Sequence, residues 1–135
     1  MTGAIVSYAH GIEANLEKAR LSRAKFLEAR FQKARCAKAQ FHDANLVSAD
    51  WKESDLRDAE FYRASLQAAH FDKANLTGAK FQEANLSDTF FHGAVMDDQT
   101  LESIWKARNW RNAHFDEAIR ERLETLAAKH GQDVK

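Results

Sequence analysis

The side chains that could carry out covalent or acid–base chemistry are few and poorly grouped. The chain has one cysteine, Cys36, and six histidines, and it contains neither a C-x-x-C nor an H-E-x-x-H motif. Zinc sites use such short spacings because two ligands must meet on one turn or one helix face. A phosphate-binding glycine loop and a G-x-S-x-G motif are also missing. We therefore expect no metal, no cofactor and no enzymatic activity.

Two pairs of polar residues could still be considered as sites. Asp97 and Asp98 are adjacent carboxylates, but the capping of a helix that begins there explains them better than acid–base work. His42 and Tyr62 lie 20 residues apart, a spacing that becomes meaningful below, and are only suggestive. Neither pair is sufficient to predict a catalytic site in a chain that lacks the motifs named above.

Composition limits the class of protein. The chain has 135 residues, the size of one domain, and its 20 basic and 20 acidic residues cancel. This balance argues against a globally basic surface for nucleic acid and against a uniformly acidic DNA mimic. One thiol permits no internal disulfide, which favours a reducing compartment, the cytoplasm. No apolar run is long enough to span a membrane, and residues 1–4 do not resemble the start of a signal peptide.

The elements that must position these side chains are set by a five-residue repeat. Every fifth residue from Ala14 to Ala94 is alanine at 15 of 17 positions. Two residues further on, from Leu16 to Met96, Leu or Phe stands at 14 of 17 positions, and the other three are also apolar. The remaining positions of each unit are mostly polar or charged.

A period of five excludes the two commonest elements. In an α-helix, five residues advance roughly 500°, so the apolar positions would spread over every face. In a flat strand, an odd period would send successive apolar residues to opposite sides. All of them can point inward only if the backbone turns a corner in each unit. Four corners close a coil of 20 residues, and stacked coils form a β-solenoid.

This pattern resembles the pentapeptide-repeat family, whose consensus is A-(D/N)-L-x-x. Residues 44–48, 74–78 and 84–88 (ANLVS, ANLTG and ANLSD) are near-consensus copies. The resemblance implies an all-β solenoid, a right-handed quadrilateral β-helix. Basic residues replace Asp or Asn at Arg20, Lys25, Arg30 and Arg35.

We expect three parts. Residues 1–13 form an irregular first coil or N-terminal cap, since Gly11 stands where a large apolar residue belongs. Residues 14–98 form about four coils of β-helix, and residues 99–135 form an α-helical C-terminal cap.

Residues 20 apart should stack on one another at the strand spacing. The expected core ladders contain Cys36 as a buried structural residue, together with Leu16, Phe31, Phe41, Leu46, Trp51, Leu56, Phe61, Leu66, Phe71, Leu76, Phe81, Leu86 and Phe91. On the outside, Arg23, Asp43, Arg63 and Glu83 form a ladder of alternating sign. Most charges are thereby explained as pairs within the protein.

The sequence changes its period after Asp98. It predicts a short helix from Asp98 or Thr100 to about Ala107 and a second helix over 113–129. The cap residues are Leu101, Trp105, Phe115, Ile119, Leu123 and Leu126. Two interpretations stay open. The helices only cover the last coil, or they also join a homodimer, as C-terminal segments do in some members of the family that the chain resembles.

Three functions are compared. The first is a non-enzymatic protein-binding or scaffold module, with Leu27, Val47 and Ala68 as an outer patch toward an unidentified protein partner. The alternative, implied by the resemblance, is a DNA-mimicking regulator of a type II topoisomerase, DNA gyrase; residues 51–98 carry 9 acidic and 5 basic side chains. The third, direct nucleic-acid binding, is the weakest, because the consecutive basic middle positions fall on four different sides of the coil.

Overall fold

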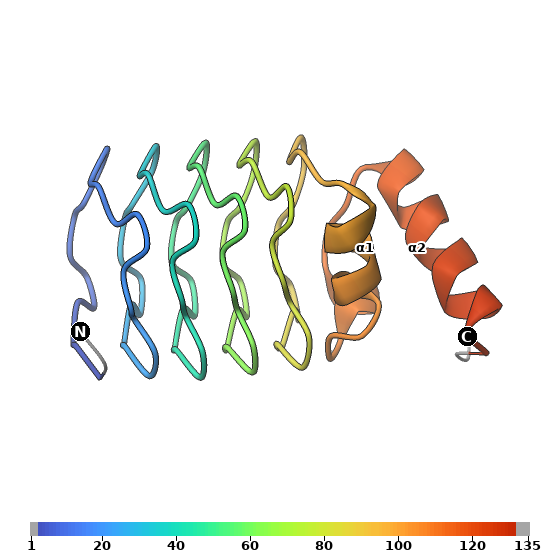
Figure 1. Cartoon of the computed structure of the whole chain (residues 1–135), viewed down its shortest axis with the longest axis horizontal. Helices are drawn as coiled ribbons and strands as arrows, with labels where there is room; N and C mark the ends of the chain where they lie inside the picture. The colour runs from blue at the N-terminus through green and yellow to red at the C-terminus, as the bar shows by residue number, and fades with distance from the viewer. Residues whose placement is uncertain (1–2, 132–135) are drawn as a thin grey trace.

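The computed structural model describes residues 3–131 and is a right-handed quadrilateral β-helix closed by helices at its C-terminal end (Figure 1). Parallel β-bridges join residues 20 apart, from Ile5–Lys25 to Asn75–Val95. The helices are α1 (Asp98–Ile104), the short 3-10 helix η1 (Trp110–Asn112) and α2 (Glu117–Lys129). Within residues 3–131, none of the helices has the length and apolar character needed to cross a bilayer.

Each corner of the coil is a tight turn that one residue closes in the left-handed conformation. In the unit around Ala44, the Ala44 N–H donates to the Phe41 carbonyl (3.1 Å), and Asp43 between them has a φ of 59°. Left-handed backbone is costly for residues other than glycine. It persists because the ladder holds the turn from both sides, as when the Asp43 N–H donates to the Tyr62 carbonyl (2.9 Å).

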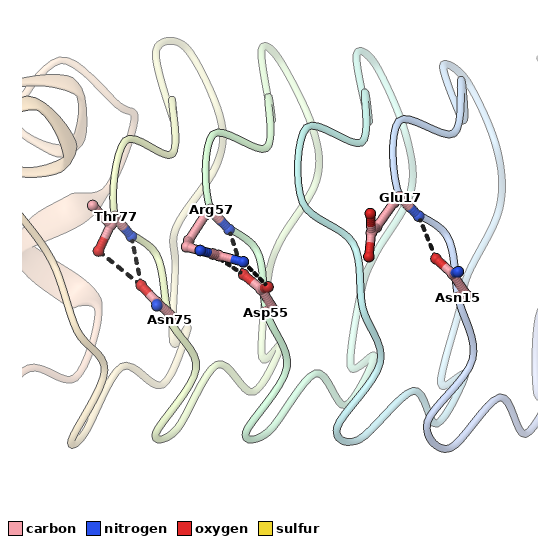
Figure 2. A network of polar contacts seen from close by, with 6 residues as sticks. All are labelled: Asn15, Glu17, Asp55, Arg57, Asn75 and Thr77. Carbon is pink, nitrogen blue, oxygen red and sulfur yellow. Dashed lines mark hydrogen bonds and ion pairs between the residues drawn. The ribbon is translucent and has the colours of Figure 1, made fainter.

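The preference for Asp or Asn in the second position of the unit has a local cause. The side-chain oxygen accepts a hydrogen bond from the N–H two residues later: the Arg57 N–H donates to Asp55 Oδ1 (3.2 Å) and the Thr77 N–H to Asn75 Oδ1 (3.1 Å) (Figure 2). This Asx arrangement pre-orders the next turn. Arg35, in the same column, has no such oxygen, so the ladder alone supports its turn.

The core consists of stacked side chains in columns along the axis. Phe41, Phe61 and Phe81 stack with centroid distances of 5.0 and 4.9 Å and nearly parallel rings. All the expected ladder residues are buried except Leu16, which is partly buried in the first coil. Alanine fills the other inward position of nearly every unit.

The first coil differs from the expectation of an irregular segment over residues 1–13. Residues 1–2 lie outside the described part, but the ladder begins at Ile5 and the turns at Tyr8 and Glu13 have the ordinary left-handed φ. The irregularity is confined to the core. A Cβ on Gly11 would lie 2.1 Å from Phe31 Cε1, because the Phe31 ring occupies the space that a larger residue at position 11 would fill.

The C-terminal segment pairs the free edge of the last coil. In the last coil, eight N–H groups point toward the C-terminal segment, and all have acceptors there. They belong to Leu76, Gly78, Phe81, Glu83, Leu86, Asp88, Phe91 and Gly93. Five acceptors are carbonyls, of Val95, Lys106, Arg108, Asn112 and His114. Three are side-chain oxygens, of Asp97, Ser103 and Asp116.

This pairing explains why both helices are shorter than their periodicity predicts. α1 ends at Ile104 rather than near Ala107, and α2 begins at Glu117 rather than at 113. Between them, Arg108 and His114 flank η1 and form bridges to Asn85 and Phe90. Of the expected cap residues, Leu101, Phe115 and Leu123 are buried, while Trp105, Ile119 and Leu126 are partly buried against the same core.

The inward alanines leave no room for a larger side chain. We expect Ala64→Leu to destabilise the fold by about 1–3 kcal/mol, because Ala64 is fully buried and the coil cannot widen. Urea denaturation measures the loss. Ala37→Leu, on the outer surface, is the control and should change stability by less than about 0.5 kcal/mol. Equal stability of the two variants would contradict the packing described.

Asp97 joins the helix cap to the solenoid. Its Oδ1 accepts hydrogen bonds from the N–H groups of Thr100 (2.9 Å) and Gly78 (3.2 Å). Burial raises the pKa of this carboxyl, but the hydrogen bonds from Thr100 and Gly78 outweigh it, and the pKa lies below its ordinary value. The ionised form therefore stabilises the fold above the unfolded pKa, and this contribution disappears as pH falls through the folded pKa.

We expect Asp97→Ala to lower the free energy of unfolding by about 1–2 kcal/mol at neutral pH. Asp97→Asn keeps an acceptor oxygen and should lose less. The difference between wild type and Asp97→Asn should shrink in acid, where the carboxyl of the wild type is protonated. Denaturation measured from neutral to acidic pH tests this, and a difference independent of pH would show that the charge of Asp97 does not contribute.

Candidate interaction face

The groups that could do chemistry are placed where they serve the fold. Cys36 is fully buried in its ladder, and burial, followed by the charge of Asp55, raises the pKa of its thiol to about 12. Since the thiolate is the nucleophile, this cysteine is inert in the folded protein. Among residues 3–131, no group of three or more His, Cys, Asp or Glu side chains could hold a metal ion.

His42, His70 and His114 are part of the outer ladders. His42 Nε2 lies 2.7 Å from Glu60 Oε1, and its ring meets Tyr62 edge to face at 5.0 Å. His70, Phe90 and His114 form one stack with centroid distances of 4.5 and 4.7 Å. These rings pack mainly on their column neighbours. Asp97 caps α1, while Asp98 pairs with Arg122 of α2 (2.5 Å), so the two adjacent carboxylates do not act together.

A hollow beside the cap helices is open to solvent. Its volume is about 560 Å³, and it is lined by Asp98, Ala118, Glu121, Arg122, Thr125 and Leu126. Catalytic pockets usually exclude water and bring a few polar groups together. Here the Arg122–Asp98 ion pair is the main polar feature, and it is explained by the attachment of α2 to α1.

Three sides of the solenoid carry charged side chains that have side-chain partners within a coil or in the next coil. Arg63 donates to Asp43 (Nε–Oδ1 3.0 Å), and Arg57 donates to Asp55 (Nε–Oδ1 2.8 Å) on another side (Figure 2). On the third, Gln32 donates to Asp50 (2.8 Å). The side-chain hydrogen bond from the arginine is the first cause that holds the pKa of Asp43 and of Asp55 below its ordinary value.

The fourth side is free of charge over two successive coils and part of a third. Its outward residues, which we call the neutral face, are Asn45, Val47, Ser48, Ser65, Gln67, Ala68, Asn85 and Ser87. All eight are half-buried by their neighbours. Charged residues appear only at its ends, with Lys25 and Glu28 before it and Asp88 after it.

The backbone of the neutral face is held by the ladder and by local side-chain bonds. Ser48 donates from its N–H to the Gln67 carbonyl (2.9 Å), and Ala68 to the Ser87 carbonyl (3.1 Å). The side-chain oxygens of Asn45 and Asn85 accept from the N–H groups of Val47 and Ser87 (both 3.1 Å). The face is therefore rigid, and the side-chain oxygens of Asn45 and Asn85 already accept hydrogen bonds within the protein.

The sequence identified two residues of this face and missed its extent. Val47 and Ala68 lie within it, and Leu27 stacks one coil before Val47; all three are half-buried. The expectation rested on apolar side chains, whereas the distinguishing property is the missing charge. Reading the outward residues in columns 20 apart would have shown it. The same columns place Arg20, Lys25, Arg30 and Arg35 on four different sides, in bridges to Gln40, Asn45, Asp50 and Asp55, as the repeat predicts.

Comparison with known proteins agrees with this architecture. The family model described as the pentapeptide repeat region matches residues 14–91. The chain is a pentapeptide-repeat protein. The match covers more than half of the chain and lies within the regular coils. No curated protein matches the sequence.

Solved structures of other pentapeptide-repeat proteins resemble it. A pentapeptide repeat protein from the thylakoid lumen of Arabidopsis thaliana is 30% identical, with a TM-score of 0.58 over 68% of this chain and 61% of that one. HetL, involved in heterocyst differentiation regulation in the cyanobacterium Nostoc, is 22% identical, with a TM-score of 0.39 over 84% of this chain and 58% of HetL. The plasmid-mediated fluoroquinolone resistance protein QnrB1 is 13% identical, with a TM-score of 0.35 over 95% of this chain and 71% of QnrB1.

These similarities describe the fold of the pentapeptide-repeat protein and leave its partner open. The chain spans less than two thirds of the length of the Arabidopsis protein and of HetL. The neutral face and the paired charges of the other sides are properties of this chain's own residues.

The burial of Cys36 predicts that its thiol does not react in the folded protein, and this can be tested directly. We expect Cys36 to stay unreactive toward a thiol reagent such as Ellman's reagent in the folded protein and to react fully in denaturant, because its raised pKa keeps it protonated. The control is Ala37→Cys in a Cys36→Ala background, which places a thiol on the outer surface one residue away. Equally fast labelling of both proteins under native conditions would show that Cys36 is accessible.

Proposed function

We propose that this pentapeptide-repeat protein is a non-enzymatic binding module that holds a protein partner against its neutral face. The observation that carries the proposal is the run of uncharged, half-buried outward residues across three coils, on a surface whose other sides carry paired charges. The cores of protein–protein interfaces are depleted of charged residues in the same way, because a charge buried without a partner is costly.

The rigidity of the solenoid suits this role. Binding to a flexible surface costs conformational entropy for every side chain and loop that becomes ordered. The neutral face consists of short side chains on a backbone that is hydrogen-bonded to both neighbouring coils. A partner therefore meets a surface that is already ordered. The charged residues at its ends, Lys25, Glu28 and Asp88, would remain wet at the rim of the contact.

The area of the face limits the kind of complex. Standard interfaces use roughly 20–30 residues on each side, and the neutral face has eight. It can be the core of a small, transient interface, or the centre of a larger one that extends over a corner onto an adjacent side. We propose a partner with a flat, uncharged surface, and we place both proteins in the cytoplasm, where Cys36 stays reduced.

A DNA-mimicking function is less well supported by the geometry. The acidic residues of the later coils do not line one face: Asp55, Glu60 and Asp72 belong to three different sides. Asp55 is paired with Arg57, and Glu60 contacts His42. A mimic of the DNA backbone needs regularly spaced, unpaired negative charge. Action on DNA gyrase is therefore the alternative that the supercoiling assay described below tests.

The test places charge on the neutral face and compares it with charge elsewhere. We expect Val47→Asp/Gln67→Asp to reduce the recovery of a specific partner in quantitative pull-downs by at least tenfold, because two carboxylates would be buried in the contact. Ala37→Asp/Thr77→Asp introduces the same charge at equivalent outward positions on another side and should keep the partner.

Equal recovery with the two double variants would contradict the proposal. A supercoiling assay with DNA gyrase is run on the same three proteins. Inhibition that all three share would show that the neutral face is not the functional surface and would favour the topoisomerase hypothesis. Circular dichroism confirms that the variants remain folded.

A further inference from the structure

The side of the solenoid that carries the neutral face has its outward residues in three columns along the axis. One edge column is joined by parallel bridges and contains Lys25, Asn45, Ser65 and Asn85. The other edge column lies in the left-handed turns and contains Glu28, Ser48, Ala68 and Asp88. The column between them contains Leu27, Val47, Gln67 and Ser87. The coil before the neutral face therefore has a cation on one edge and an anion on the other.

These two charges are not used within the chain. Lys25 and Glu28 are exposed, and within residues 3–131 neither of them forms an ion pair. The charges of the other sides differ in this respect, since Arg63 pairs with Asp43 and Arg57 with Asp55. An opposite charge for Lys25 and for Glu28 can therefore come from another molecule.

We propose that the partner of the neutral face is a second copy of the chain, which lies side by side with the first and points in the same direction. The proposal rests on the proposed function and names the partner of the same face. A twofold axis that runs along the two solenoids places each coil against the same coil of the other copy and exchanges the two edges of the face. Lys25 then lies level with the partner's Glu28, and Glu28 lies level with the partner's Lys25.

The uncharged coils are compatible with the same arrangement. Their outward side chains are short, or are amides and hydroxyls that can both donate and accept hydrogen bonds, so no charge is buried without a counter-charge. One coil before Lys25, Ile5 and Tyr8 occupy the two edge columns. The twofold axis brings Ile5 level with the partner's Tyr8, which adds apolar contact beside the ion pairs.

An antiparallel dimer of the same faces brings like charges together. Its twofold axis crosses the solenoids and keeps each edge column against the same column of the other copy. If the two neutral faces are centred on Ser65, Lys25 meets the partner's Arg108, which bridges to the same column. If they are shifted by one coil, Glu28 meets the partner's Asp88. Like charges in contact are costly, so the charges favour the parallel dimer.

The size of the contact sets its strength. Five coils with three outward residues each, from Ile5 to Asp88, offer 15 residues per copy, whereas standard interfaces use roughly 20–30 on each side. We therefore expect a dimer that dissociates in the micromolar range. It differs from a dimer of the cap helices, because α2 takes no part in it.

The first measurement is the mass by multi-angle light scattering from low to high micromolar concentration. We expect the wild type to approach twice the 15.4 kDa of one chain and Val47→Asp/Gln67→Asp to stay monomeric. Aspartate stands at the same position of the repeat in Asp72, so this variant is compatible with the fold. Ala118→Glu/Thr125→Glu, on exposed positions of α2, should keep the dimer.

A charge exchange tests the direction of the two chains. Lys25→Glu should raise the dissociation constant of the dimer at least tenfold, because it faces the partner's Glu28, and Lys25→Glu/Glu28→Lys should restore it. Arg20→Glu is the matched control, since Arg20 stacks on the uncharged Gln40 of another side as Lys25 stacks on Asn45. A double variant as weak as Lys25→Glu alone would overturn the parallel arrangement.

The outcomes separate this proposal from the proposed function. A wild type that is monomeric at every concentration, while Val47→Asp/Gln67→Asp loses a different protein in pull-downs, would overturn the homodimer and leave the binding module standing. A dimer that Val47→Asp/Gln67→Asp leaves intact, or that only the α2 variant abolishes, would also overturn the proposal, because the contact would lie elsewhere. The pull-downs then decide the proposed function by themselves.

Discussion

The structure depends on how little space a square coil encloses. With a corner in every five residues, each side can send inward one large side chain and one methyl group, and the ladder fixes their order along the axis. Phe41, Phe61 and Phe81 can stack at about 5 Å because backbone bonds 20 residues apart set that spacing. The same bonds hold residues such as Asp43 in a left-handed conformation that they would otherwise avoid.

A consequence of this constraint is that the ends require special residues. A stacked coil always leaves an edge and an uncovered core at each end of the solenoid. At the C-terminal end, the chain leaves the repeat and uses helices for the core and Asp97, Ser103 and Asp116 for the last N–H groups. In the first coil, the Phe31 ring enters the space beside Gly11.

The same constraint decides where function can reside. The inward positions are occupied by packing, which leaves Cys36 protonated and inert, and the corners are too short to form a pocket. Only outward residues remain, and their columns determine the character of each side. On three sides, charges such as Arg63 and Asp43 pair with each other. On the fourth, the neutral face offers a rigid, uncharged surface, which is the property that a protein partner can use.

The sequence by itself determined the coil and the order of the core ladders, because a strict period of five leaves a single geometry in which all apolar residues point inward. Of the predicted charge column Arg23, Asp43, Arg63 and Glu83, the structure joins Asp43 and Arg63 by hydrogen bonds. The sequence also indicated Val47 on the outer surface. It could not determine the end of α1 or the start of α2. Both helices are shortened because Arg108 and His114, which lie between them, form bridges to the last coil. The place of Phe31 over Gly11 and the acceptors of the last N–H groups were likewise decided by contacts between residues about 20 apart. Periodicity describes one chain segment at a time, whereas these features depend on which segments meet.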